Sequence, residues 1–171
     1  RLGGKLRTSP FAGHGGIDEG ADAFLARVPH AVDLAADLGV PLTAPRALSA
    51  AIYHRRLHRL PAETVLGVPA SPVALARSRL LSPGGVARAA IEPLLPRRPD
   101  GDSIGTLIRQ RFGDEVHERL VDALVGSIYG ADTDRFSLAM VPQLAALAER
   151  HRSLLVAARQ VRRAASRGPS A

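Results

Sequence analysis

Residues 1–8 read RLGGKLRT, a glycine doublet with a basic side chain on either side. Glycine lets backbone N–H groups come close to a bound phosphate, because it has no side chain and readily takes left-handed backbone angles. Arg1 and Lys5 can add charge-assisted hydrogen bonds to the same group. Arg1, Gly3, Gly4 and Lys5 therefore predict contact with a diphosphate. The alternative is an ordinary glycine turn between charged residues.

A second segment of small residues, GADA at positions 20–23, follows a predicted strand. Gly20, Ala21, Asp22 and Ala23 would let the backbone lie against one face of a flat ring, with N–H groups directed at the polar edge of the ring. A strand-to-helix turn with Asp22 as the helix N-cap would explain this segment taken alone. Its position shortly after the glycine doublet favours the binding interpretation.

The composition favours a helix-rich core and excludes several kinds of chemistry. Of the 171 residues, 46% are hydrophobic but only 4% are aromatic, so the core must consist of Leu, Val, Ile and Ala. There is no cysteine, which excludes disulfides, thiolate metal sites and a cysteine nucleophile within these residues. We expect no metal site, because His54 and His58 fall in a predicted strand and the loop with Asp132 and Asp134 offers too few ligands.

The chain is strongly basic, with a net charge of +7 carried almost entirely by arginine. Such a charge suits nucleic acid, an anionic membrane surface or an acidic small ligand, but it also results from a bias in composition. Nucleic acid is disfavoured, because the few aromatic residues are dispersed rather than placed among the arginines for base stacking. No apolar run of about 18 residues suggests a membrane-spanning helix.

Periodicity and turn signals predict a few strands followed by a mostly helical second half. The predicted strands cover residues 6–9, 17–19, 48–56 and 57–60, with a turn over 11–16. The predicted helices cover residues 31–38, 73–81, 86–95, 103–112, 115–128, 138–151 and 154–164. We expect Asp102, Asp114 and Ser137 to cap helices, and a turn over 83–85.

Nine segments resemble the bacterial protoporphyrinogen/coproporphyrinogen oxidase family. They are residues 1–8, 16–25, 57–61, 66–69, 102–105, 111–120, 127–132, 138–147 and 151–154. The Arg-x-Gly-Gly element is shared with amine oxidases and carotenoid desaturases. The Gly-Asp-Glu segment at 113–115 and the Ile-Tyr-Gly-Ala-Asp segment at 128–132 are more particular to the porphyrinogen oxidases.

The resemblance implies an α/β (α+β) fold that is an internal fragment of a larger enzyme. It implies a partial FAD-binding Rossmann-like domain without its first βαβ unit, together with a mostly helical lobe for substrate and membrane contact. Residues 1–47 would belong to the FAD-binding domain, 48–100 to a substrate-binding region and 101–165 to the helical lobe, with a tail at 166–171. The G-x-G-x-x-G element expected before residue 1 is absent.

The resemblance also implies a function in heme biosynthesis. Family members hold FAD non-covalently and oxidise a porphyrinogen to a porphyrin, with dioxygen as the electron acceptor. Arg1, Gly3, Gly4 and Lys5 match positions along the FAD diphosphate and ribose, and Gly20 to Ala23 match the segment under the isoalloxazine. No catalytic residue can be named. We expect the fragment alone to be inactive and to bind FAD weakly or not at all, because many cofactor contacts would lie outside it.

The resemblance and the charge also bear on the substrate and on the location in the cell. The arginine-rich sequence favours the coproporphyrinogen branch, whose substrate carries more propionates, and residues 49–56 are the best candidate for contact with them. The resemblance implies a cytoplasmic protein, and some members of the family rest on a membrane surface. Two alternatives stay open: another flavin amine oxidase or desaturase, and a basic helical module that binds nucleic acid or acidic lipid.

Overall fold

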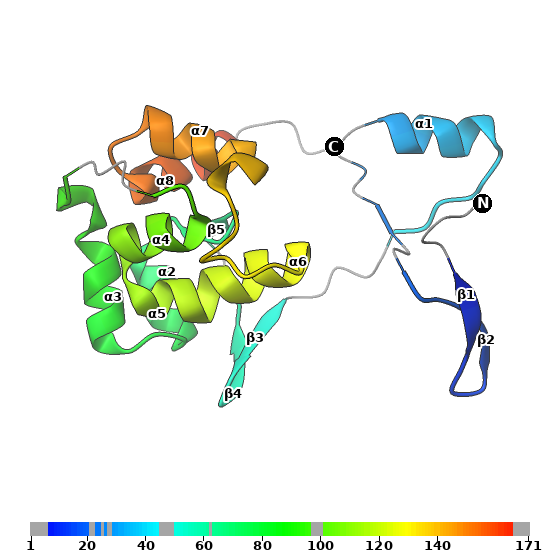
Figure 1. Cartoon of the computed structure of the whole chain (residues 1–171), viewed down its shortest axis with the longest axis horizontal. Helices are drawn as coiled ribbons and strands as arrows, with labels where there is room; N and C mark the ends of the chain where they lie inside the picture. The colour runs from blue at the N-terminus through cyan, green and yellow to red at the C-terminus, as the bar shows by residue number, and fades with distance from the viewer. Residues whose placement is uncertain are drawn as a thin grey trace. The chain divides into compact units, whose positions relative to one another are not determined.

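The computed structural model describes residues 7–20, 23–24, 26, 29–44, 50–61, 63–96 and 101–165. The chain separates into two compact units, residues 1–47 and 48–171. The first contains a β-hairpin and a helix, and the second contains short hairpins and most of the helices (Figure 1). This mixture confirms the predicted α/β (α+β) class.

The first unit begins with an antiparallel hairpin of β1 (Thr8–Phe11) and β2 (His14–Asp18). The predicted hairpin is confirmed, but the prediction of a turn over 11–16 is wrong. Only Ala12 and Gly13 form the turn, and both have a positive φ, of 50° and 82°. Two-residue turns of this kind match the twist of the flanking strands, so pairing continues up to the turn.

Helix α1 (His30–Asp37) confirms the helix predicted over 31–38. It ends at Asp37 with Leu38 as its C-cap, and Gly39, with a φ of 66°, takes the left-handed conformation common after a helix. Ala35 is the one buried hydrophobic residue among the described residues of this unit, whereas Leu34 and Leu38 are exposed. The described part of the first unit therefore has no apolar core of its own.

The second unit begins with two hairpins. Strands β3 (Ala51–His54) and β4 (Arg56–Arg59) pair in antiparallel fashion around Arg55, which confirms the pair predicted over 48–60. Strands β5 (Thr64–Val65) and β6 (Val68–Pro69) form a further small hairpin that the sequence did not predict. Strands of two residues are too short to show an alternating pattern.

Three short helical elements follow: α2 (Pro72–Ser78), α3 (Pro83–Ala90) and the 3₁₀ turn η1 (Glu92–Leu94). The predicted turn over 83–85 is wrong, because these residues form the first turn of α3. Ser82 caps this helix by accepting a hydrogen bond from the N–H of Gly85 at 3.0 Å. Pro83 occupies the first position of α3, where the missing N–H of proline costs nothing because that group has no partner within the helix.

Helix α4 (Ile104–Phe112) confirms the helix predicted over 103–112, but with a different cap. The side chain of Ser103, not that of Asp102, accepts a hydrogen bond from the N–H of Thr106 at 3.1 Å. Gly113, with a φ of 90°, ends the helix as expected.

A continuous helical segment follows as α5 (Asp114–Val116), η2 (His117–Gly126) and α6 (Ser127–Tyr129). Of the residues predicted at four-residue spacing, Val116 and Leu120 are buried and Leu124 packs against the core, but Ile128 is exposed. Residues of η2 are bonded as a π-helix, in which i→i+5 hydrogen bonds widen each turn. The buried face therefore moves on to Val121 and Val125. Nor does Asp114 cap the segment.

The chain ends with η3 (Leu138–Met140), α7 (Pro142–Arg150) and α8 (Leu154–Ala165). The helix predicted over 138–151 is interrupted at Val141, because a residue before proline is pushed out of the helical conformation. Ser137 caps η3, as predicted, by accepting a hydrogen bond from Ala139.

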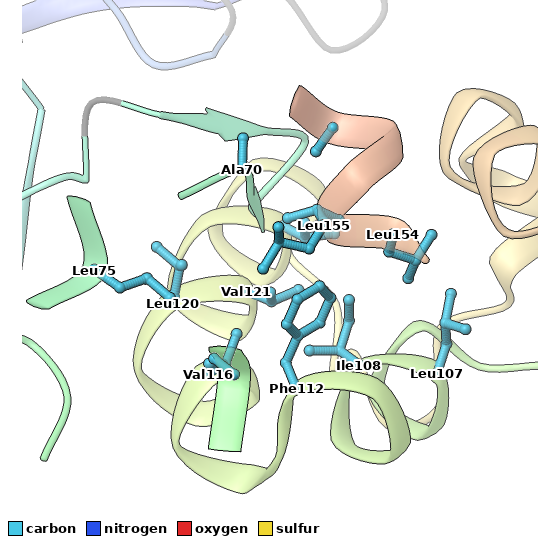
Figure 2. Close-up of a cluster of buried hydrophobic side chains, with 14 of the residues drawn as sticks. Ala70, Leu75, Leu107, Ile108, Phe112, Val116, Leu120, Val121, Leu154 and Leu155 are labelled. Atoms are coloured by element: carbon cyan, nitrogen blue, oxygen red, sulfur yellow. The ribbon is translucent and has the colours of Figure 1, made fainter. Parts of the chain in front are cut away.

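The core of the second unit draws on nearly all of its elements (Figure 2). Phe112 and Ile108 from α4 pack with Val121, while Leu75 from α2 lies beside Leu120. Leu154 and Leu155 close the core from α8. One core therefore extends across the predicted boundary at residues 100 and 101. Within the described ranges no helix is long and apolar enough to cross a membrane.

Candidate functional site

The β1–β2 hairpin brings together the chain segments that flank the two predicted cofactor-binding stretches. Thr8 pairs with Asp18, and the N–H of Glu19 donates to the carbonyl of Arg7 at 2.8 Å. The guanidinium of Arg7 also lies 3.3 Å from the Glu19 carboxylate. The residue after positions 1–6 and the residue before Gly20 therefore lie side by side at the open end of the hairpin.

The predicted cofactor-binding residues themselves are described only in part. Gly20 and Ala23 are described, and both are exposed. The other six lie outside the described residues: Arg1, Gly3, Gly4, Lys5, Ala21 and Asp22. The binding roles of all eight stay predictions.

A cationic cavity of about 420 Å³ lies in the second unit, beside the tip of the β3–β4 hairpin. Three of its lining residues come from the stretch predicted to contact substrate, namely His54, Arg55 and Arg56. Its remaining lining residues are His58, Arg79, Leu80, Leu81, Ser82 and Arg119. The sequence analysis predicted substrate contact for residues 49–56, but it did not predict that Arg79 and Arg119 would line the same cavity.

Glu115 anchors one wall of this cavity. Its carboxylate accepts hydrogen bonds from the Ser82 N–H at 2.8 Å and the Ser82 hydroxyl at 2.7 Å, and it pairs with Arg119 at 3.1 Å. Burial works to raise the pKa of the Glu115 carboxyl, but the hydrogen bonds from Ser82 and the charge of Arg119 outweigh it, so the pKa is lowered. Glu115 is thus a stable anion that fixes Ser82 and Arg119.

The ring of His58 links the β3–β4 hairpin to α2. The ring nitrogens of His58 lie 3.2 Å from the carbonyl of Ser78 and 3.1 Å from that of His54. No group of three or more His, Cys, Asp or Glu side chains that could hold a metal occurs in the described ranges.

An ion-pair cluster surrounds Arg109. Arg109 pairs with Asp114 at 2.7 Å, Glu118 at 3.1 Å and Asp134 at 3.0 Å. The hydrogen bond from Arg109 lowers the pKa of the Asp134 carboxyl. Asp122 accepts a hydrogen bond from the Thr133 hydroxyl at 2.6 Å. The cluster ties the loop after α6 to the start of α5.

A buried ion pair joins η1, α4 and α8. Glu92 is fully buried and pairs with Arg111, whose Nε lies 2.7 Å from the Glu92 carboxylate. The same carboxylate accepts hydrogen bonds from the Ser153 hydroxyl and from the N–H groups of Leu154 and Leu155. Glu92 therefore supplies the negative charge that the N-terminus of α8 favours. The sequence did not predict this pair, because its partners are far apart in the chain.

Gly105 explains one of the motifs behind the family resemblance. A Cβ at this position would lie 2.2 Å from Oδ1 of Asp134 and 2.7 Å from its Cα. The N–H of Gly105 donates to the carbonyl of Thr133 at 2.8 Å. Residues 102–105 and the loop that follows the motif at 128–132 therefore meet each other, and their role here is in packing.

A family model described as "Flavin containing amine oxidoreductase" matches residues 1–168. The chain belongs to this family. Membership confirms the resemblance inferred from the motifs and implies a flavin cofactor.

Relatives with curated names include porphyrinogen oxidases. The chain is 35% identical to coproporphyrinogen III oxidase of Bacillus subtilis over 95% of its own length and 36% of the relative. It is 39% identical to coproporphyrinogen III oxidase of Mycobacterium leprae over 85% of its own length and 33% of the relative. Protoporphyrinogen oxidase 2 of Arabidopsis thaliana is 29% identical. The chain spans about a third of the length of these relatives.

A solved structure supports the fold. A crystal structure of a protein from Exiguobacterium sp. 255-15, assigned as a protoporphyrinogen oxidase, matches 94% of the chain and 38% of that protein. The TM-score is 0.74 and the sequence identity 27%. The arrangement of helices and short sheets is therefore one that a member of this family adopts.

Proposed function

We propose that these residues form part of an FAD-dependent porphyrinogen oxidase. The observation that carries the proposal is the register of the β1–β2 hairpin, in a chain that belongs to a flavin-containing family. The register brings Arg7 beside Glu19, and these two residues adjoin the stretches 1–6 and 20–23 in the sequence. Such an arrangement fits a ligand that presents a diphosphate to one stretch and a flat ring to the other.

In this proposal the residues of the chain bind and orient the cofactor. Arg1 and Lys5 neutralise the diphosphate, while Gly3 and Gly4 let the backbone approach it. Residues 20–23 lie along the isoalloxazine. When bound, the flavin would take hydride from the substrate and pass the electrons to dioxygen. The chain then needs no strong acid or base of its own for that step.

The proposed substrate is coproporphyrinogen III, with protoporphyrinogen IX as the alternative. The relatives named coproporphyrinogen III oxidase are more similar to this chain than the relative named protoporphyrinogen oxidase. The proposal includes a role in heme biosynthesis. A cytoplasmic location and contact with a membrane surface remain predictions.

The decisive experiment measures oxidation of coproporphyrinogen III by the full-length product of the gene that encodes these residues. We expect porphyrin fluorescence to appear together with hydrogen peroxide. Gly4→Val should remove bound FAD, because its side chain would hold the backbone away from the diphosphate. Arg7→Gln is the matched control and should retain FAD, because Arg7 pairs with Glu19 instead. A product that lacks flavin, or that oxidises amines but no porphyrinogen, would refute the proposal.

We further predict that residues 1–171 alone bind FAD more weakly than about 1 μM. The chain contains no G-x-G-x-x-G, and hence not the helix N-terminus that normally holds the pyrophosphate. Titrating FAD fluorescence with the purified chain tests this. Tighter binding would show that residues 1–47 hold the cofactor unaided.

A further inference from the structure

Two arginines at the cationic cavity stand where the backbone favours glycine. Arg55, at the turn between β3 and β4, has a φ of 59°, and Arg79, which ends α2, has a φ of 54°. Glycine is the usual residue both in tight hairpin turns and after helices, because it takes left-handed angles without steric cost. Arginine at both positions weakens the fold, and both side chains line the same cavity.

The register of the β3–β4 hairpin shows how a third arginine, Arg56, comes to line the same cavity. Ile52 pairs with His58 and His54 pairs with Arg56, so these four share one face of the two-stranded sheet. Ile52 and His58 are buried, so this face is directed at the core. Arg56, at the tip of the hairpin, therefore shares this face with His58, and it lines the cavity while remaining exposed to solvent.

Most of this charge is not neutralised within the described part of the second unit. Arg119 pairs with Glu115 at 3.1 Å and donates to the carbonyl of Leu80 at 3.2 Å. Arg55, Arg56 and Arg79 make no side-chain hydrogen bond or ion pair with any described residue. None of the described residues that line the cavity is acidic, and Glu115 adjoins it only through Ser82 and Arg119. Three guanidinium groups are thus available to a ligand around one hollow of about 420 Å³.

We infer that this cavity binds a multiply charged oxyanion, a ligand that carries two or more carboxylate or phosphate groups. The planar fork of arginine matches the paired oxygens of both groups. Placing arginine at two left-handed positions is explained if each side chain is needed for binding, since stability alone would favour glycine. The inference concerns residues 54–119 only and does not depend on the proposed flavin site.

The test is calorimetric titration of the purified chain with citrate and with pyrophosphate, each at constant ionic strength, with chloride as the reference. We expect at least one of them to bind above the chloride baseline, and Arg55→Gly and Arg79→Gly each to weaken binding about tenfold or more. Arg77→Gln is the matched control, because it removes the same charge from an exposed position on α2 that does not line the cavity. It should change affinity by less than about twofold.

A thermal melt of each variant separates binding from folding. Both glycine variants should unfold at or above the wild-type temperature, because glycine relieves the left-handed conformation. If a glycine variant melts at a lower temperature than the wild type, anion binding is measured instead with Arg55→Asn and Arg79→Asn. Asparagine also removes the charge and tolerates the left-handed conformation. Citrate binding alone assigns a carboxylate ligand, and pyrophosphate binding alone assigns a phosphate ligand. Binding of neither anion, equal weakening by Arg77→Gln, or full binding by the folded Asn variants would overturn the inference.

Discussion

In the described part of residues 7–44, Phe11, Leu34 and Leu38 are exposed and only Ala35 is a buried hydrophobic residue. In residues 50–165, by contrast, helices and hairpins share one apolar core. The residues expected to hold the cofactor belong to the first unit, and most of the motifs particular to the family belong to the second. The difference shows that family membership and core building rest on different residues, because the motif at 128–132 contains the exposed Ile128 and Tyr129, while the core is built from other residues of the same unit.

Two phenylalanines test the contrast most directly. Phe112 is 1% exposed and Phe11 is 72% exposed. We expect Phe112→Ala to lower the free energy of unfolding by about 3–5 kcal/mol, through lost burial and the cavity left behind. Phe11→Ala should change it by no more than about 0.5 kcal/mol. Urea denaturation followed by circular dichroism measures both, and similar losses would mean that the hairpin is packed as tightly as the core.

The buried pair offers a second comparison, within the second unit. Glu92→Ala should cost about 3 kcal/mol or more, because it leaves Arg111 charged and buried and removes the acceptor at the start of α8. Glu118→Ala is the control, since Glu118 is largely exposed and one of three partners of Arg109. It should cost about 1 kcal/mol or less. The same denaturation assay applies, and a small loss for Glu92→Ala would show that water reaches Arg111.

Gly105 and Gly84, both in helices, differ in the space around them, and this difference predicts opposite effects of alanine. Gly105→Ala should destabilise the protein by about 1–3 kcal/mol, because the new methyl group would overlap Asp134. A methyl group added at Gly84 would have the Ser82 hydroxyl oxygen as its nearest neighbour, 3.7 Å away. Gly84→Ala should therefore leave stability unchanged or raise it by up to about 1 kcal/mol. Melting temperatures that shift in the same direction would contradict this assignment.

The smallest expected effect is on how the stability of the fold depends on pH in the acid range. Arg109 lowers the pKa of Asp134 in the folded state, so the unfolded state binds the proton more tightly. The stabilisation is present above the unfolded pKa of about 4 and is lost as pH falls through the lower folded value. Because Asp134 is partly exposed, Asp134→Asn should flatten this acid loss by about 1 kcal/mol or less. Unfolding measured between pH 2 and 6, with Asp33→Asn as an exposed control, checks the sign.

Local chemistry made several elements predictable. Gly39 and Gly113 follow their helices as expected. The β1–β2 and β3–β4 hairpins occur where strand-forming residues predicted pairs of strands. The errors lie at the starts of helices and within η2. Ser82 and Ser103 cap helices in place of the predicted turn and the predicted Asp102, because their hydroxyls reach the free N–H groups. The i→i+5 bonding of η2 moves the buried face away from the predicted four-residue spacing.

The sequence by itself determined the family, the helix-rich composition, the absence of cysteine chemistry and the two glycine stretches proposed to bind a flavin nucleotide. These follow from residue types and short spacings, which local backbone chemistry interprets. Only the tertiary structure decided that Glu92 meets Arg111, that Gly105 meets Asp134, and that arginines from a hairpin turn, a helix end and η2 surround one cavity. Arg55 and Arg119, which line the same cavity, are 64 positions apart in the chain, and no local pattern encodes which of many arginines will come together.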